Sequence, residues 1–337
     1  MKTRILVTLG PSSFNTEIIR QLDNEIVDLF RINLSHTALA VLEEQITYVQ
    51  SLTHIPICVD SEGSQIRNHA MQDGAVLFTQ GSEVLIHNEE ILGDESNISF
   101  SPIRVFNDFV VGDRIRIDFN SAALKVIELG PKQIKAIVET AGKVGSRKAV
   151  DLDRIIDLPA ITPKDIQAIA LSKELGVSNF ALSFARSGKD VDMMRKLTGS
   201  KSTIISKIEC RQALTNLVEI IKRSDELLID RGDLSRELPL EKIPFLQRRI
   251  VSISKALGKP IHVATNLLES MVTSKEPTRA ELNDVVSTLL SGADGLVLAS
   301  ETAIGAYPVE CVKMIKKLGA VFWKWTENSS IDDIVSM

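Results

Sequence analysis

The chain has 337 residues, of which 44% are hydrophobic and 25% charged, and its formal net charge at pH 7 is −5. That composition is typical of a soluble globular protein, and no apolar run is long enough to span a membrane. A net negative charge without runs of lysine and arginine argues against binding to nucleic acid. The three cysteines are widely spaced, which disfavours both a disulfide framework and a zinc site. Because the first strand is expected to begin at Arg4, we expect no signal peptide and a cytoplasmic location.

Strand-like and helix-like segments alternate from the start of the chain. The first three strands are predicted over residues 4–9, 27–32 and 55–59, where apolar and β-branched residues cluster. Helices are expected after the first two strands, and Asn15 should cap the first of them. This order predicts parallel strands joined by helices.

From about residue 68 to residue 153 the helical period vanishes. Short runs that alternate between apolar and polar residues replace it, separated by Gly, Asn and Asp; the clearest cover residues 84–87, 113–118, 125–128 and 133–138. Such alternation is typical of antiparallel strands with one solvated face. The sequence therefore predicts a small β-barrel-like domain over 68–153, inserted after strand three of a domain made of 1–67 and 154–337.

The alternation of strands and helices resumes after the insertion. Five more strands are predicted, over residues 179–184, 202–206, 226–230, 261–264 and 295–299. Eight parallel strands with crossover helices favour an α/β fold of the (β/α)8 TIM barrel type. A doubly wound open sheet is the alternative, although no Gly-x-Gly-x-x-Gly turn supports it. Only about the last ten residues are expected to be loosely held.

Polar side chains gather where the predicted strands end. They are Arg31, Asn33, Ser35, Asp60, Arg67, Ser183, Lys207, Glu209, Asp233, Thr265, Ser300 and Glu301. Because the carboxyl ends of parallel strands open onto one rim of a barrel, so many polar groups there favour an enzyme over a scaffold. A surface salt bridge remains the plain interpretation of any single pair.

The chemistry of these residues is consistent with phosphoryl transfer. Glu209 and Asp233 offer the carboxylate oxygens that Mg²⁺ prefers. Arg31, Arg67 and Lys207 would surround a phosphate-like charge, with the Lys207 side chain facing the open rim. Asp230 lies on the strand side of Arg231 and is expected to be structural.

The sequence resembles the pyruvate kinase family over about residues 3 to 320. The most specific matches are the Ala264–Met271 stretch (ATNLLESM) and the Pro277–Glu281 stretch (PTRAE). Further matching stretches are TLGPSS from Thr8, FRINLSH from Phe30, ISKIE from Ile205, RGDL from Arg231 and SET from Ser300. The resemblance implies a glycolytic kinase that transfers a phosphoryl group between phosphoenolpyruvate and ADP, yielding pyruvate and ATP.

The resemblance also implies roles for individual residues. Lys207 would neutralise the phosphoryl group, Arg31 would bind it, and Thr265 would take part in protonating the enolpyruvate. Mg²⁺ would be held by Glu209 and Asp233, and a monovalent cation, K⁺, by Asn33, Ser35, Asp60 and Ser61. Substrate or nucleotide contacts are further expected at Pro11, His36, Arg67, Lys148, Gly232 and Asp233. The inserted domain would be the lid that closes over the nucleotide.

Several positions depart from the family pattern. Glu62 stands where the family has lysine, and Gln65 stands where an acidic residue accompanies dependence on K⁺, which leaves the K⁺ requirement open. The residues bordering the adenine also differ, so the nucleotide preference is open. The C-terminal effector domain is expected to be missing, and with it regulation by sugar phosphates. A homodimer formed through the barrel is one arrangement that the resemblance allows.

Two other functions stay open at this point. Glu209, Asp233 and Mg²⁺ could polarise a 2-keto acid such as oxaloacetate, which would make the protein a lyase or decarboxylase. Alternatively, it could be a non-catalytic relative that binds or regulates a partner, although such a protein should have lost its catalytic charges first.

Overall fold

The computed structural model describes residues 3–25, 27–118 and 121–337, which form two compact units. One unit consists of Met1–Gly63 and Ala160–Met337, and the other of Ser64–Pro159. The second unit extends beyond the 68–153 expected from the sequence at both ends. The reason is that strand β4 (Ile66–Asn68) pairs with strands of this unit, and Leu158 packs in its hydrophobic core.

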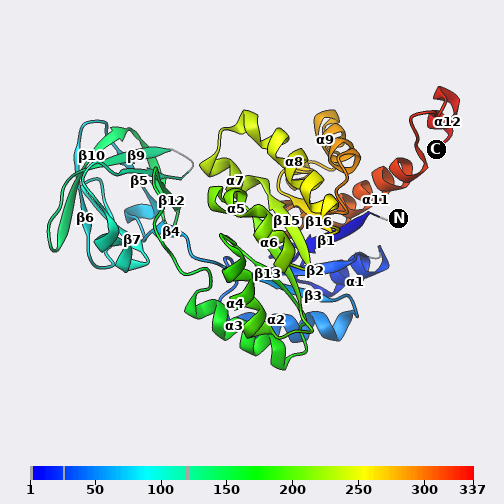
Figure 1. Cartoon of the computed structure of the whole chain (residues 1–337), viewed down its shortest axis with the longest axis horizontal. Helices are drawn as coiled ribbons and strands as arrows, with labels where there is room; N and C mark the ends of the chain where they lie inside the picture. Colours follow the sequence, from blue (N-terminus) through cyan, green and yellow to red (C-terminus); the bar gives the residue numbers. More distant parts are fainter. Residues whose placement is uncertain (1–2, 26, 119–120) are drawn as a thin grey trace. The chain divides into compact units, whose positions relative to one another are not determined.

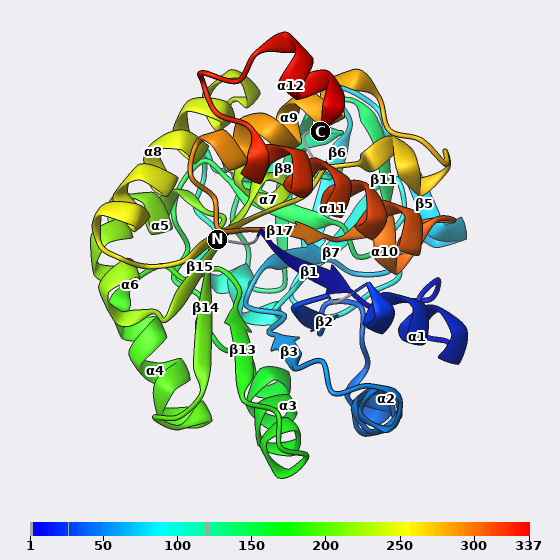
Figure 2. The same ribbon diagram turned by 90° about the vertical axis from the view of Figure 1, so that its right-hand side faces the viewer.

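The first unit is a closed barrel of parallel strands, which are labelled between Figure 1 and Figure 2. Its strands are β1 (Arg4–Thr8), β2 (Leu29–Asn33), β3 (Ile57–Asp60), β13 (Asn179–Leu182), β14 (Thr203–Ile208), β15 (Glu226–Asp230), β16 (Ile261–Ala264) and β17 (Gly295–Leu298). Strand β1 pairs with both β2 and β17, and β3 pairs with β13 across the insertion in the sequence. The predicted (β/α)8 barrel is confirmed, and the open sheet is excluded.

Helices surround these strands, as Figure 2 shows. The surrounding helices are α1 (Thr16–Asn24), α2 (Leu39–Leu52), α3 (Pro163–Glu174), α4 (Gly188–Thr198), α5 (Arg211–Thr215), α6 (Leu217–Arg223), α7 (Arg231–Glu237), α8 (Ile243–Ala256), α9 (Arg279–Leu290), α10 (Ser300–Ala303) and α11 (Pro308–Lys324). A last helix, α12 (Ile331–Ser336), follows α11. Side-chain caps begin several of them: Asn15 caps α1, and Thr162 with Asp165 forms a capping box before α3.

The inside of the barrel is filled by one residue from each strand. This buried cluster consists of Leu6, Leu29, Cys58, Ala181, Ile205, Leu228, Ala264 and Val297. Neighbouring residues in the strands, such as Ile204 and Ile229, belong instead to the larger core that includes helix residues. This alternation follows from the two-residue period of a strand, and it fixes which side chains reach the mouth of the barrel.

The second unit is a smaller closed barrel with the strand order β10-β6-β7-β4-β12-β8-β9. Besides β4, its strands are β6 (Glu83–His87), β7 (Asn97–Ser101), β8 (Arg114–Ile117), β9 (Ala122–Glu128), β10 (Gln133–Thr140) and β12 (Ala149–Leu152), while β5 (Ala75–Phe78) pairs with β11 (Gly142–Gly145). The sequence predicted antiparallel strands throughout. That was wrong for one pair, because β6 and β7 run parallel.

Helix α12 lies near the end of the chain and none of its residues is buried, so the expected looseness of the last ten or so residues stays a prediction. Helix α12 begins with a capping box in which the Ser330 and Asp333 side chains each accept a backbone N–H. Within the described ranges, no helix combines the length and apolar character needed to cross a bilayer.

Candidate active site

Polar side chains line the mouth of the barrel because of the strand period. Six polar residues lie two positions after a member of the buried cluster inside the barrel, so they face the same way. They are Thr8, Arg31, Asp60, Ser183, Lys207 and Asp230, all of them buried. Glu209 follows β14, Thr265 follows β16, and Asp233 lies in the first turn of α7. The rim therefore collects a carboxylate or a cation from each of β2, β3, β14 and β15.

Lys207 lies at the centre of this group. Its Nζ is 2.9 Å from Glu209 Oε2, 3.5 Å from Asp230 Oδ2 and 3.6 Å from Asp60 Oδ2, and it donates a hydrogen bond of 3.2 Å to Ser183 Oγ. Burial alone would lower the pKa of Lys207, but the three carboxylates outweigh it and raise the pKa, so the ammonium stays charged. Contrary to the expectation of a side chain facing the open rim, Lys207 is only 4% exposed.

Arg31 forms a second cationic centre beside Lys207. Its Nε donates to Asp60 Oδ2 at 2.7 Å, and its Nη1 donates to Thr8 Oγ1 at 2.8 Å. Asp60 also accepts from Ser183 Oγ at 3.1 Å, so its carboxylate connects Arg31 with the Lys207 group. Two fixed cations within one buried network can attract an anionic group such as a phosphate.

Three acids lie close together on the other side of Lys207. One oxygen from each of Glu209, Asp230 and Asp233 lies within 4.8 Å of the other two. Burial raises the pKa of Glu209 well above its usual range, although Lys207 acts against this; burial and the nearby Asp230 likewise raise the pKa of Asp233. Glu209 Oε2 accepts no hydrogen bond from the described residues, although Lys207 lies beside it as an ion-pair partner. This set of hard oxygen donors fits a divalent cation such as Mg²⁺.

Asp230 belongs to this group, although we expected it to be structural. Its Oδ1 accepts hydrogen bonds from Thr265 Oγ1 at 2.7 Å and from the Gly232 N–H at 3.2 Å. Burial would raise the pKa of Asp230, but Lys207 and the Thr265 hydroxyl lower it, so the carboxylate stays ionised. The signal that could have found Asp230 is the strand period, since it lies two residues beyond the inward-facing Leu228.

Thr265, the residue after β16, has an unusual backbone conformation and contacts residues at the end of β15 and the start of α7. Its φ of +78° lies in the left-handed region, which a β-branched residue rarely adopts. The hydroxyl donates to Asp230, the carbonyl accepts from Arg231 Nε at 3.0 Å, and a Cβ at Gly232 would come within 2.9 Å of the Thr265 methyl. These contacts therefore fix the direction of the hydroxyl.

Other predicted residues of the barrel unit make local contacts. Asn33 Oδ1 accepts from the Ser35 N–H at 3.0 Å, and Ser61 Oγ accepts from the Ser183 N–H at 2.9 Å. Pro11 lies in the turn after β1, and the His36 N–H donates to the Asn33 carbonyl. Asn33 is paired with Asp60 across β2 and β3, and Ser61 follows Asp60, so these residues expected to hold a monovalent cation lie along the same strand ends.

The structure gives Glu301, at the last strand end, a supporting position. Its carboxylate accepts from the backbone N–H groups of Leu268 and Ala299 at 3.1 and 2.8 Å. Glu301 therefore braces the loops after β16 and β17, and its 1% exposure leaves it little access to a ligand.

The predicted basic residues of the second unit lie near one another within that unit. Arg67 is paired with Ala149 across β4 and β12, and its Nη1 donates to the Arg147 carbonyl at 3.0 Å. Lys148 Nζ is 3.4 Å from Asp118 Oδ2 and its side chain is 45% exposed. These residues therefore lie near one another, with Lys148 in an ion pair with Asp118 and partly open to solvent.

The chain matches a family model described as "Pyruvate kinase, barrel domain" over residues 1–312. It is 34% identical to the pyruvate kinase of Methylorubrum extorquens over 96% of this chain and 70% of that protein. The chain belongs to the pyruvate kinase family. The pyruvate kinase of Thermotoga maritima is 35% identical over 94% of this chain and 70% of that protein, and that of Staphylococcus aureus is 33% identical over 94% and 56%.

Within this pyruvate kinase family chain, the departure at Glu62 has a local partner. Glu62 Oε2 lies 2.9 Å from Lys164 Nζ, which also donates to the Leu34 carbonyl. The Glu62 and Gly63 N–H groups both donate to the carboxylate of Asp165, which is fully buried. Asp165 therefore ties the end of the first barrel segment to the start of α3.

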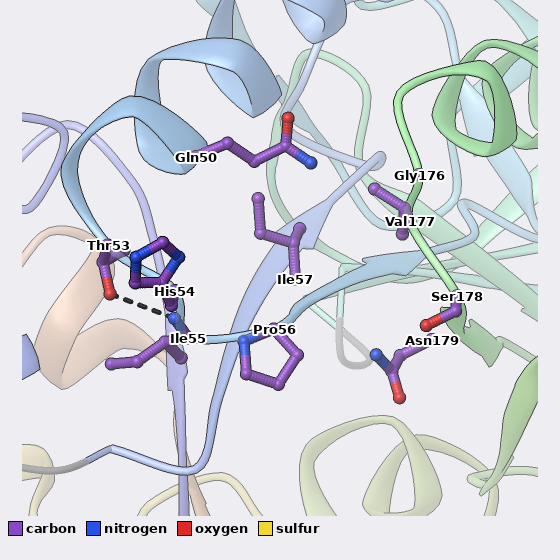
Figure 3. A pocket seen from close by; sticks show the side chains of 10 residues that line it. All are labelled: Gln50, Thr53, His54, Ile55, Pro56, Ile57, Gly176, Val177, Ser178 and Asn179. Carbon is purple, nitrogen blue, oxygen red and sulfur yellow. Dashed lines mark hydrogen bonds between the residues drawn. The ribbon is translucent and has the colours of Figure 1, made fainter.

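A cavity of about 220 Å³ lies at the opposite rim of the barrel, where β3 and β13 begin (Figure 3). Gln50 and Ile57 border it on one side and Ser178 and Asn179 on the other. None of its ten lining residues is an acid, a lysine or an arginine. The candidate active site at the other rim instead carries the charges of Arg31, Lys207 and the carboxylates around them.

Proposed function

We propose that this chain catalyses transfer of the phosphoryl group of phosphoenolpyruvate to a nucleoside diphosphate, with Mg²⁺ as cofactor. The observation that carries the proposal is the placement of the Lys207 ammonium between the Arg31–Asp60 pair and the Glu209–Asp230–Asp233 acids. Phosphoryl transfer needs fixed positive charge around the moving group and very little covalent chemistry, which is what this arrangement supplies.

In the proposed reaction, Lys207 and Arg31 bind and neutralise the phosphoryl oxygens. Both side chains are buried and already held by carboxylates, so little reorganisation is needed when the substrate enters. Glu209 and Asp233 would hold Mg²⁺, which when bound supplies charge that stabilises the transferred group and the enolate oxygen. Thr265 presents its hydroxyl at the same rim, in reach of a role in protonating the enolpyruvate carbon.

The nucleotide is assigned to the second unit as part of the same proposal. Arg67, Arg147 and Lys148 lie close together within that unit, and positive charge suits the phosphates of a nucleoside diphosphate.

The three cysteines are free and buried, which supports a reducing, cytoplasmic setting.

A coupled assay tests this function directly. Phosphoenolpyruvate is mixed with the protein, Mg²⁺ and each of several nucleoside diphosphates, with and without K⁺, and pyruvate release is followed. We expect release that requires both Mg²⁺ and a nucleotide. Turnover of oxaloacetate without nucleotide would support the lyase instead, and binding of neither Mg²⁺ nor phosphoenolpyruvate by calorimetry would support a non-catalytic protein.

A further inference from the structure

At the candidate active site, two hydrogen-bond donors point at the carboxylate of Asp230. The Thr265 hydroxyl and the Gly232 N–H both donate to Asp230 Oδ1, at 2.7 and 3.2 Å. The structure therefore shows these two donors binding a carboxylate, and the carboxylate is the protein's own. They lie beside Lys207, whose Nζ is 3.5 Å from the other oxygen of Asp230.

A substrate with a carboxylate would compete with Asp230 for these donors. The substrate of the proposed function, on which this step rests, carries a carboxylate next to its phosphorylated oxygen. Asp230 is buried and its Oδ1 already accepts from both donors, so a second carboxylate would meet an occupied donor set. Unless Asp230 moves, the carboxylate end of the substrate cannot use Thr265 and Gly232.

The acid cluster offers Asp230 another position. An oxygen of Asp230 already lies within 4.8 Å of an oxygen of Glu209 and of Asp233, so rotation of its side chain can bring it into a cation's coordination shell. A carboxylate that binds a divalent cation gains more than one that accepts two ordinary hydrogen bonds, because the cation carries two full charges.

We infer that Asp230 is a built-in occupant of the substrate-carboxylate site, which it leaves when a divalent cation binds to Glu209 and Asp233. Asp230 then makes the cation a prerequisite for binding the carboxylate of the substrate, in addition to any direct contact between them. This role makes Asp230 a specificity-determining residue of the site and predicts that the cation binds first.

The test measures binding of pyruvate, a carboxylate without a phosphate, by isothermal calorimetry in the absence of divalent cations. Asp230→Ala empties the donor set, and we expect it to bind pyruvate at least tenfold more tightly than the wild type. Asp230→Asn removes the same charge but keeps an oxygen that can accept from Thr265 and Gly232, so its gain should be much smaller. Asp230→Ser is the second variant if the alanine variant does not fold.

A charge control separates occupancy from electrostatic repulsion. At a pH roughly one unit above the raised pKa of Glu209, which is about 8, Glu209→Gln removes one negative charge from the same cluster without emptying the donors. It should then improve metal-free binding far less than Asp230→Ala, measured at the same pH. Equal gains in Asp230→Ala, Asp230→Asn and Glu209→Gln would overturn the inference, because repulsion alone would explain them. No gain in Asp230→Ala or Asp230→Ser would overturn it as well.

The same series distinguishes this inference from the proposed function. Suppose that the wild type binds pyruvate with Mn²⁺ present, but that without Mn²⁺ the variants bind pyruvate no more tightly than the wild type. The inference then fails and the proposed function stands. If the wild type binds neither pyruvate nor phosphoenolpyruvate even with Mn²⁺, the proposed function fails and the inference fails with it.

Discussion

Replacing Lys207 by methionine removes the ammonium from three surrounding carboxylates while keeping most of the side-chain volume. Asp60 would still have Arg31, and Asp230 would still have Thr265 and Gly232. Glu209 would be left with a buried Oε2 and no cation within hydrogen-bond distance among the described residues. Removing one partner of a buried ion pair typically costs about 3–5 kcal/mol, so we expect Lys207→Met to lose about that much unfolding free energy at pH 7.

Urea unfolding followed by circular dichroism measures this loss. Two further variants test whether the loss comes from the buried ion pair between Lys207 and Glu209. Lys164→Met removes a lysine whose ion-pair partner, Glu62, is about one-third exposed, and it should cost only about 1 kcal/mol or less. The double variant Lys207→Met/Glu209→Gln removes both charges and should recover part of the loss.

The same substitution should abolish most of the proposed phosphoryl transfer. Loss of a preorganised charge at a transition state typically lowers kcat about 10²–10³-fold. If the unfolding free energy of Lys207→Met instead lies within about 1 kcal/mol of the wild-type value, the placement of Lys207 as the central buried counter-ion is refuted. A double variant less stable than Lys207→Met would contradict the pairing with Glu209.

Three further predictions address other parts of the barrel. Glu226 accepts from Arg4 and lies 2.8 Å from His262; burial acts to raise its pKa, but these partners lower it to about 2. Its ionised form therefore contributes stability above about pH 4.5, and this stability is lost as the pH falls towards about 2. Glu226→Gln should lower the unfolding free energy by about 2–3 kcal/mol at pH 7 and by progressively less in acid. A cost that does not depend on pH would contradict this. Asp165→Ala should lower the unfolding free energy by about 2–3 kcal/mol in urea, because three backbone N–H groups lose their acceptor. A loss below about 0.5 kcal/mol, roughly the scatter of surface substitutions, would show that Asp165 does not tie the first barrel segment to α3. Glu209→Gln should weaken Mn²⁺ binding at least about tenfold in calorimetry, and unchanged binding would remove Glu209 from the cation site.

Much of the barrel could be predicted from the sequence because its strands are short apolar runs separated by long helical periods. The bounds of β15 and β16 agree with the prediction, and the other barrel strands differ by a few residues at their ends. The second unit was harder. Its strands β4, β5 and β11 have three or four residues, too few for alternation to stand out, and the parallel pairing of β6 with β7 depends on contacts that a local pattern does not encode.

The candidate site was predictable in its residue types and less so in its contacts. Lys207, Glu209 and Asp233 were found because they follow strand ends, and they do lie together. The burial of Lys207 was missed, since exposure depends on which neighbouring strands face it. Asp230 was missed because its position inside a strand suggested a structural role, whereas the two-residue period brings it into the mouth.

The most direct test of the account is a single ³¹P NMR time course of phosphoenolpyruvate, a nucleoside diphosphate, Mg²⁺ and the protein. We predict that the phosphoenolpyruvate resonance falls while the γ-phosphate resonance of the nucleoside triphosphate rises in equal amount. The exchange should stop when Mg²⁺ is chelated. Unchanged phosphoenolpyruvate, or its conversion to inorganic phosphate without nucleoside triphosphate, would contradict the account.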